Sequence, residues 1–421
     1  MKTTGLIGAA GMAGFAGCLG GGSGGSGDES TDKPLEVMHG WTGGDGKKAV
    51  NNLTSTFKDS HSDMETNFRP IGGGGNENLD AVVAKRLRND NPPSAFANWP
   101  GKNLIKYEGA LGNIEKDVWE EADLKSSHVK EAVDKCKYND KMSAVPIGSH
   151  RLNCLFYNVN VVEKAGVDPK SLDSPKALVD AMDKVKQKTD AAPMALGGKN
   201  TWPTLQLWAV NMLGQSGYSK YMDYVNGKGP KSAVKSSFET TKEMITGYTN
   251  EDASTIGFTE ANQKIMSGDA AFIHQGNWVA GAYKSEDLKY NEDWGFVPYP
   301  GTKGMYTLHI DAFLYPSNNP SPKKSKEWMR FVGGKDAQVA YNKWKGSIPT
   351  RKDVSTDEFG PYLTETIEDF KNAKHRPPTI AHGLAVEPET LTSLKEVISS
   401  NFSGPYNVDA ATNAMIDKVQ G

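Results

Sequence analysis

The 421-residue sequence lacks the motifs of the common metal-dependent and nucleophilic enzymes. It has no His-Glu-x-x-His and no Cys-x-x-Cys, and no Gly-x-Ser-x-Gly at a predicted strand-to-helix turn. Its 8 histidines are scattered, whereas a metal site needs clustered ligands, so no metal or other cofactor is predicted. The run Gly72–Gly75 has no Gly-Lys-Ser/Thr after it, which excludes a nucleotide P-loop. We expect a flexible loop that offers backbone N–H groups near a cleft.

A strong charge of either sign is also absent. The chain has 48 Lys and Arg against 51 Asp and Glu, and the net charge of −3 gives no electrostatic basis for binding nucleic acid or an anionic membrane surface. Hydrophobic residues make up 37% and charged residues 24%, as in a soluble globular protein. The length is too great for one ordinary core and predicts two lobes or domains.

The N-terminus has no apolar run long enough to span a bilayer as a helix. Residues 6–17 are short and Gly/Ala-rich, as in a secretory signal, and no twin-arginine pair precedes them. Phe15-Ala16-Gly17-Cys18 is similar to a lipobox, so residues 1–18 are predicted to be a signal peptide with lipidation at Cys18; the alternative is a leftover thiol in a cleaved peptide. Residues 19–34 form a flexible Gly/Ser tether. We therefore expect an exported protein that a lipidated cysteine anchors to the outer face of the cytoplasmic membrane.

Cysteine is otherwise rare, with only Cys136 and Cys154 after the tether. An exported chain permits a disulfide between them, but their spacing does not give their distance. A disulfide and two buried thiols both remain open.

Strand-like and helix-like segments alternate after the tether. Strands are predicted at 35–41, 64–70 and 94–100, and helices at 46–60, 78–90 and 102–111. Val50, Leu53 and Phe57 share one face of the first helix. This order predicts a mostly parallel sheet with helices on its faces. Residues 135–148 are predicted to form a hairpin that turns at Asn139-Asp140.

A second α/β region runs from about residue 150 to about residue 305. Residues 151–167 are predicted as a strand and a helix, followed by helices at 175–188, 204–214 and 232–249 and strands at 270–274, 294–301 and 305–313. The C-terminal quarter is mostly helical. The fold class is therefore α/β, with a ligand cleft between two lobes.

Eleven residues fall in turns after strands or between the lobes, where α/β sheets bind ligands. They are Trp41, Asp45, Asn98, Trp99, His150, Arg151, Trp202, Trp278, Asp311, Lys345 and His382. Tryptophan offers a rigid face for the C–H surface of a sugar ring, and charged groups make the strong hydrogen bonds to its hydroxyls. Next to Trp278, Gly276 and Asn277 are expected to leave room for that ring. The set predicts a neutral-sugar site.

Each candidate also has a structural explanation. Any single tryptophan can be a core residue, and Asp45 can cap the helix that begins near Gly46. Lys345 can be a solvated charge, His382 a satisfied loop histidine, and Arg151 the partner of a lobe carboxylate.

The order of several short motifs resembles that of a known family. They are VPIGSHRLNCLFYN (145–158), GNWVAG (276–281), GFVPYPGTKG (295–304), IDAF (310–313), WKGSIPTR (344–351) and AHG (381–383). From about Leu35 onwards, the chain resembles the family 1 extracellular solute-binding proteins of ABC sugar importers, and most closely their glucose-binding branch. The resemblance implies a type II periplasmic-binding-protein fold, with residues 35–148 plus about 308–345 in lobe 1 and residues 149–307 plus about 346–421 in lobe 2.

The resemblance also implies roles. A sugar would stack on Trp278 and bond to Asp311, Lys345 and His382, while Trp41, Asp45, His150 and Arg151 match further motifs. The implied function is capture of a neutral monosaccharide, glucose or a related hexose, by a monomer that delivers it to a membrane permease without catalysis.

The chain departs from the family pattern at two places. Ala97 and Trp99 stand where a relative has glutamine and histidine, and the segment around Asn200–Trp202 is longer. A disaccharide or oligosaccharide is therefore the alternative ligand. A surface carbohydrate-active enzyme and a lectin are the alternatives from other functional classes.

Overall fold

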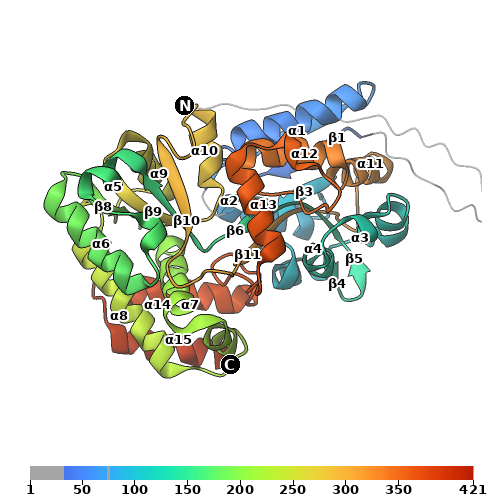
Figure 1. Ribbon diagram of the computed structural model, residues 1–421. Coiled ribbons are helices and arrows are strands. Elements are labelled where there is room, and N and C mark those ends of the chain that lie inside the picture. Colours follow the sequence, from blue (N-terminus) through green and yellow to red (C-terminus); the bar gives the residue numbers. More distant parts are fainter. Residues whose placement is uncertain (1–32, 74–75, 421) are drawn as a thin grey trace, which may run out of the picture.

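The computed structural model describes residues 33–73 and 76–420, which form two lobes that are each organised around one β-sheet (Figure 1). The predicted signal peptide, Cys18 and nearly all of the predicted tether lie outside these residues. Within the described part of the chain, no helix is both long and apolar enough to cross a bilayer.

The first lobe contains a five-stranded sheet in the order β2-β1-β3-β11-β6. Its strands are β1 (Leu35–His39), β2 (Thr66–Pro70), β3 (Ala95–Asn98), β6 (Ala144–Arg151) and β11 (Leu308–Leu314). Strand β1 is parallel to β2 and β3, whereas β11 is antiparallel to β3 and β6. The three strands from which a mostly parallel sheet was predicted are parallel, and β6 runs in their direction, so the prediction is confirmed for these strands. The sheet is nevertheless mixed, because β11 returns from the second lobe and inserts antiparallel between β3 and β6.

The second lobe contains a four-stranded sheet in the order β10-β7-β9-β8. Its strands are β7 (Cys154–Asn158), β8 (Ala192–Ala195), β9 (Ala270–Gln275) and β10 (Trp294–Pro298). Only the pairing of β8 with β9 is parallel, whereas β7 pairs antiparallel with both β9 and β10, so this sheet is mixed as well. The predicted hairpin is present as β4 (Lys137–Tyr138) and β5 (Lys141–Met142), with positive φ at Asn139 and Asp140.

Helices cover both sheets. Around the first sheet lie α1 (Lys47–Ser60), α2 (Glu77–Arg88), α3 (Leu124–Ser127), α4 (Lys130–Lys135), α11 (Pro322–Val332) and α12 (Lys335–Lys345). With the second sheet lie α5 (Val159–Ala165), α6 (Pro175–Lys188), α9 (Phe258–Ser267), α10 (Val279–Ser285) and α13 (Pro361–Asn372). Short helical turns are η2 (Gly101–Tyr107), η3 (Glu115–Glu120), η4 (Pro169–Ser171) and η5 (Thr356–Glu358). Residues 102–111, predicted as an α-helix, thus contribute only to the 3-10 turn η2, which begins at positive-φ Gly101 and is followed by positive-φ Gly109.

A helical layer adjoins the second sheet (Figure 1). It consists of α7 (Trp202–Val225), α8 (Lys231–Tyr248), α14 (Pro388–Asn401) and α15 (Val408–Gln420), which enclose a core around Trp208, Tyr224 and Phe238. The C-terminal quarter is mostly helical, as predicted.

The first-lobe core confirms the helical face predicted for α1. Val50, Leu53 and Phe57 are buried, and the Phe57 ring lies 5.0 Å from that of Trp328 on α11. Their spacing of three and four residues places them on one side of the helix.

Arg151 lies where β6 leads into β7 and the chain passes between the lobes. Its guanidinium pairs with Asp369 on α13 and donates to the Met305 carbonyl, which lies just before β11. Arg151 therefore links two crossing segments to the second lobe, as the structural explanation for this residue expects.

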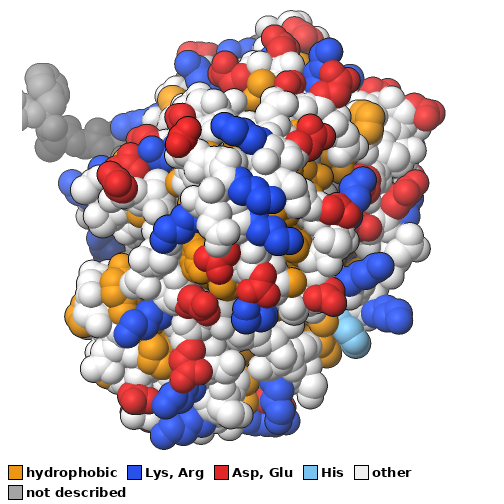
Figure 2. Space-filling model, turned by 60° about the vertical axis from the view of Figure 1, so that its left-hand side comes forward, with side chains coloured by type: hydrophobic (Ala, Val, Ile, Leu, Met, Phe, Trp, Pro, Cys, Tyr) orange, Lys and Arg blue, Asp and Glu red, His pale blue; other side chains and the backbone are white. Residues whose placement is uncertain are grey.

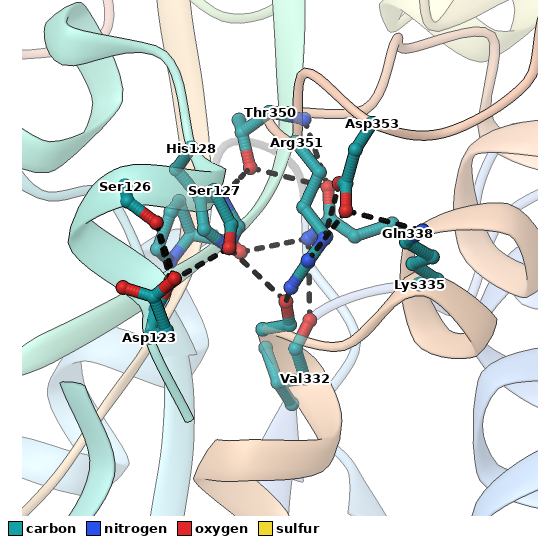
Figure 3. Close-up of polar contacts among 12 residues, drawn as sticks. Asp123, Ser126, Ser127, His128, Val332, Lys335, Gln338, Thr350, Arg351 and Asp353 are labelled. Atoms are coloured by element: carbon teal, nitrogen blue, oxygen red, sulfur yellow. Dashed lines mark hydrogen bonds and ion pairs between the residues drawn. The ribbon is translucent and has the colours of Figure 1, made fainter. Parts of the chain in front are cut away.

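A third crossing segment follows α12 and is held in the first lobe by a polar cluster (Figure 3). The Arg351 guanidinium donates to both Asp353 oxygens and to the Gly333 carbonyl, and the backbone N–H of Thr350 donates to Gln338. His128 Nε2 lies 3.1 Å from the same carbonyl, and its Nδ1 lies 2.9 Å from the Thr350 hydroxyl oxygen.

Cys136 and Cys154 are both buried free thiols. Burial raises the pKa of Cys136 and raises that of Cys154 to about 12. Of the two possibilities that the sequence leaves open, the structure shows the thiols.

Three buried imidazoles make the fold sensitive to acid. Burial lowers the pKa of His39, His128 and His274 from 6.5 to about 4. Between these values the unfolded chain binds protons that the folded chain excludes, so acid favours unfolding. We expect the free energy of unfolding to fall as the pH drops from 6.5 towards 4. The full loss for His128 alone, reached below its folded pKa, is about 3 kcal/mol.

Urea unfolding across this pH range tests the prediction, with His128→Gln as the comparison. In the variant, the unfolded chain can no longer bind a proton at position 128, so unfolding takes up one proton fewer. Its free energy of unfolding should therefore depend less steeply on pH. Equal slopes for the two proteins would contradict the role given to His128.

Candidate functional site

A cavity of about 280 Å³ lies between the two lobes. The first lobe contributes Gly40, Trp41, Thr42, Gly43, Asp45, Gly73, Asn76, Trp99, His150, His309, Asp311 and Lys345, and the second contributes Trp202, Phe258, Thr259, Trp278 and His382. Strand ends and helix starts from both lobes meet here, because the ligand-binding edge of each sheet faces the other.

Nine of the eleven predicted site residues line this cavity. They are Trp41, Asp45, Trp99, His150, Trp202, Trp278, Asp311, Lys345 and His382. Asn98 and Arg151 do not line it, and each is the chain neighbour of a residue that does. Consecutive residues of an extended chain point to opposite sides, so only one of each pair faces the cavity.

Asn98 organises the turn that carries Trp99. Its Nδ2 donates to Asp80 and to the Tyr107 hydroxyl, both at 2.7 Å. Its Oδ1 accepts from the backbone N–H of Trp99 at 2.8 Å and from Asn103 at 2.9 Å. All its polar atoms are engaged within the protein, so Asn98 positions the cavity wall rather than facing a ligand.

Trp278 follows β9 directly and stands at the start of α10, with 6% of its surface exposed. The expectation that Gly276 and Asn277 leave room for a ligand is corrected. A Cβ on Gly276 would lie 2.1 Å from the Trp278 ring itself, so the glycine makes room for the indole. Asn277 Oδ1 lies 2.7 Å from His150 Nδ1 and thus joins the two lobes.

Asp45 and Lys345 form an ion pair at the cavity wall. Lys345 Nζ lies 2.8 Å from Asp45 Oδ2, and only 4% of the lysine is exposed. Lys345 is therefore not a solvated charge. The structural alternative for Asp45 also fails, since Gly46 occupies the N-cap of α1 and no side chain caps that helix. The pair leaves no net charge at this wall.

Asp311 is a buried carboxylate in contact with three side chains. Its Oδ2 lies 3.0 Å from His150 Nε2 and accepts from the Tyr341 hydroxyl at 3.0 Å, while Oδ1 lies 3.5 Å from His309 Nε2. Burial alone would raise the pKa of Asp311, but the attraction and hydrogen bonds of His150 and His309 outweigh it and hold the pKa well below its usual range. The cavity thus presents a permanent anion whose neighbours are donors.

Aromatic rings enclose the cavity on several sides. The His382 ring lies 5.1 Å from Trp99, 5.3 Å from Trp202 and 5.1 Å from Trp278. Burial holds the pKa of His382 well below 6.5, and His309 and Lys395 lower it further. His382 is therefore neutral at neutral pH and offers one ring nitrogen as a donor and the other as an acceptor.

His309 is the most informative residue that the sequence reasoning missed. It lies two residues before Asp311 on β11, and alternate residues of a strand share a face, so the predicted position of Asp311 could have indicated it. The ladder pairs it with His150, and a register shift follows at Asp311. Thr42, Asn76, Phe258 and Thr259 carried no comparable signal. Gly73 of the predicted glycine loop lines the cavity, whereas Gly74 and Gly75 lie outside the described residues.

The arrangement suits an uncharged polar ligand. Asp45 is paired with Lys345, and Asp311 is held by two imidazoles, so the walls combine planar apolar faces with charge-assisted hydrogen-bonding groups. Among residues 33–73 and 76–420, no cluster of three His, Cys, Asp or Glu residues could hold a metal ion.

Comparison with known proteins identifies the family. Residues 55–376 match the model of the bacterial extracellular solute-binding proteins. The xylose/arabinose-binding protein XacG of Haloferax volcanii is 48% identical over 392 residues, which cover 93% of this chain and 85% of that protein. The glucose-binding protein GlcS of Saccharolobus solfataricus is 22% identical, over 72% of this chain and 58% of its own length.

Solved structures share the fold. The bacterial solute receptor AcbH, described as preferring β-D-galactopyranose, superposes with a TM-score of 0.79 at 17% identity, covering 91% of this chain and 97% of the receptor. Maltose-bound MalE3 of T. maritima superposes with a TM-score of 0.73 at 18% identity, covering 92% and 99%. The two-lobed fold, the cavity between the lobes and the match over most of the chain agree: this protein belongs to the bacterial extracellular solute-binding proteins, a family of receptors rather than enzymes.

Proposed function

We propose that this protein is the substrate-binding subunit of an ABC sugar importer and captures a neutral monosaccharide for a membrane permease. The observation that carries the proposal is a cavity between the lobes in which Trp278 offers a planar face beside the Asp45–Lys345 ion pair and the Asp311 carboxylate, which contacts His150 and Tyr341. A sugar ring presents an apolar C–H face to an indole and a rim of hydroxyls to such groups.

The size of the cavity supports a monosaccharide over a longer chain. Its volume of about 280 Å³ is near the lower end for small-molecule sites. Trp99 and Trp202 pack against His382 and narrow the space in which a second sugar unit would extend. A chitin-oligosaccharide-binding protein is among the structures with the same fold, so an oligosaccharide remains the alternative ligand.

The relatives support an aldopentose or an aldohexose. XacG, named for xylose and arabinose, is 48% identical, and GlcS, named for glucose, is 22% identical. We therefore extend the glucose expectation from the sequence and place xylose and arabinose first among the candidate ligands.

The mechanism that we propose is capture by lobe closure in a monomer. The sequence predicts lobe 1 at residues 35–148 plus about 308–345 and lobe 2 at residues 149–307 plus about 346–421. Because β6 continues in the first-lobe sheet to Arg151, we place the first boundary after residue 151. Trp278 and His382 would approach the sugar from lobe 2, and Asp45, Asp311 and Lys345 from lobe 1. The sugar favours the closed form because only there do both sets of contacts exist, and the permease would recognise that form.

A thermal-shift panel tests the proposed ligand class. We expect xylose, arabinose or glucose to raise the melting temperature, since a ligand at about 100 times its Kd adds about 2.7 kcal/mol to the stability of the folded state. Maltose and chitobiose serve as comparisons. Stabilisation by a disaccharide alone would favour the oligosaccharide alternative, and no shift with any sugar would contradict the proposal. Release of a shorter sugar from a disaccharide would indicate an enzyme.

Substitution of Trp278 tests the stacking contact. We expect Trp278→Ala to weaken binding of the stabilising sugar about 30-fold or more, because a central aromatic anchor is lost, while the protein remains folded. Trp278→Phe keeps a smaller aromatic face and should lose less affinity. Calorimetric titration that gives the same affinity for all three proteins would rule out Trp278 as the platform.

We also propose that Cys18 carries the lipid anchor and that residues 19–34 tether the lobes to the outer face of the membrane. The support is the sequence FAGC at the end of a short apolar segment, followed by a Gly/Ser-rich stretch, in a family described as extracellular. Expressed in a host that exports and lipidates the protein, Cys18→Ser should move from the membrane fraction to the medium. A variant that stays in the membrane fraction would exclude this anchor.

A further inference from the structure

Helix α10 of the second lobe lies directly on the end of α12 of the first lobe. The contact involves residues 277–284 on one side, and Asp45 and residues 343–346 on the other, and we call it the α10 seam. Acidic and basic side chains are scattered over the face of the molecule shown in Figure 2. The seam, in contrast, is made largely by backbone atoms and glycines.

Gly281 makes the closest approach in the seam. A Cβ at this position would lie 2.5 Å from the Trp344 carbonyl oxygen and 2.9 Å from those of Asp45 and Lys345. These three atoms belong to the backbone of the first lobe and cannot rotate away as a side chain can. Even a methyl group at Gly281 would therefore push α10 off the first lobe.

Two further contacts extend the seam. A Cβ on Gly346, whose φ is +83°, would lie 2.3 Å from the Asn277 carbonyl oxygen. Lys284 Nζ donates to the Lys343 carbonyl at 2.7 Å and lies 4.6 Å from the centre of the Trp344 ring. The seam thus consists of close contacts between backbone atoms of the two lobes, and the Lys284 side chain adds a hydrogen bond across it.

The seam is continuous with the walls of the cavity. Asp45 and Lys345 contribute carbonyls to it and side chains to the cavity, and Trp278 opens the helix that carries Gly281. The distance between the lobes at this seam therefore sets the distance between the indole on one wall and the ion pair on the other.

We propose that Gly281 is a positioning residue for ligand capture: because it has no side chain, the second lobe can settle on the first lobe's backbone and bring Trp278 opposite Asp45 and Lys345. Gly281 itself does not line the cavity. The inference rests on the proposed capture of a sugar. It adds that the contacts of the α10 seam form when the two lobes close around the bound sugar.

The chain offers a matched control for the test. Gly247 is also a helical glycine, in α8, and a Cβ there would meet nothing within 4 Å. Gly281→Ala and Gly247→Ala therefore make the same chemical change in the same backbone conformation and differ in the seam contact. Each variant and the wild type would be titrated with the sugar that stabilises the wild type, and small-angle scattering would be recorded with and without that sugar.

We expect Gly247→Ala to keep wild-type affinity and wild-type compaction on sugar binding. Gly281→Ala should bind the sugar roughly tenfold more weakly and fail to compact, while its melting temperature without sugar stays near that of the wild type. Unchanged affinity and compaction in Gly281→Ala would overturn the inference, as would a lowered sugar-free melting temperature with unchanged affinity, since the seam would then be a permanent structural contact.

A second variant covers the case in which Gly281→Ala does not fold. Lys284→Met removes the fastening hydrogen bond without a clash, and we expect a two- to threefold loss of affinity with no change in sugar-free melting temperature. Unchanged affinity in Lys284→Met would overturn the inference. A wild type that binds no sugar would instead overturn the proposed function, so the two failures are distinguishable.

Discussion

The antiparallel ladder between β6 and β11 is the constraint on which both the fold and the site depend. It pairs His150 with His309 and Ser149 with Ile310, and its register shift falls at Asp311. The same two strands continue into segments that cross to the second lobe, where Arg151 ties them together. A slip of one residue in this ladder would turn His309 and Asp311 to the opposite face of the sheet, and the cavity would lose the Asp311 carboxylate. Site geometry and lobe connection are therefore set by one set of backbone hydrogen bonds.

Charge balance explains how a buried cavity can hold two carboxylates. An isolated buried ion is very unfavourable, and each anion here has a cationic or hydrogen-bond-donating partner inside the protein: Lys345 for Asp45, and His150, His309 and Tyr341 for Asp311. These partners hold the two carboxylates in place without a ligand. An uncharged ligand can therefore bind to hydrogen-bonding groups that are already oriented, and it need not displace a counter-ion. A charged ligand would upset this balance, which is the electrostatic reason for favouring a neutral sugar.

Glycine has different tasks at neighbouring positions of the segment 276–281. Gly276 accommodates the Trp278 ring, and Gly281 accommodates the backbone of the other lobe. Asn277 lies between them and reaches His150 across the lobes. The space that the sequence of this stretch was expected to leave for a ligand is thus filled by the protein's own contacts.

The sequence by itself determined the class of the fold, the amphipathic face of α1, the hairpin at Asn139-Asp140, the mostly helical C-terminal quarter and nine of the cavity residues, because these follow from local periodicity, turn chemistry and motif order. Only the tertiary structure decided that both sheets are mixed, that Asn98 and Arg151 face away from the cavity, that His309 faces it, and that Cys136 and Cys154 are free thiols. Each of these depends on which distant strand inserts beside which, and in what register. Long-range pairing of that kind leaves little trace in a local sequence pattern. Alternation along a strand predicts only that one member of each neighbouring pair faces a ligand, either Asn98 or Trp99 and either His150 or Arg151. The pairing of the strands decides which member it is.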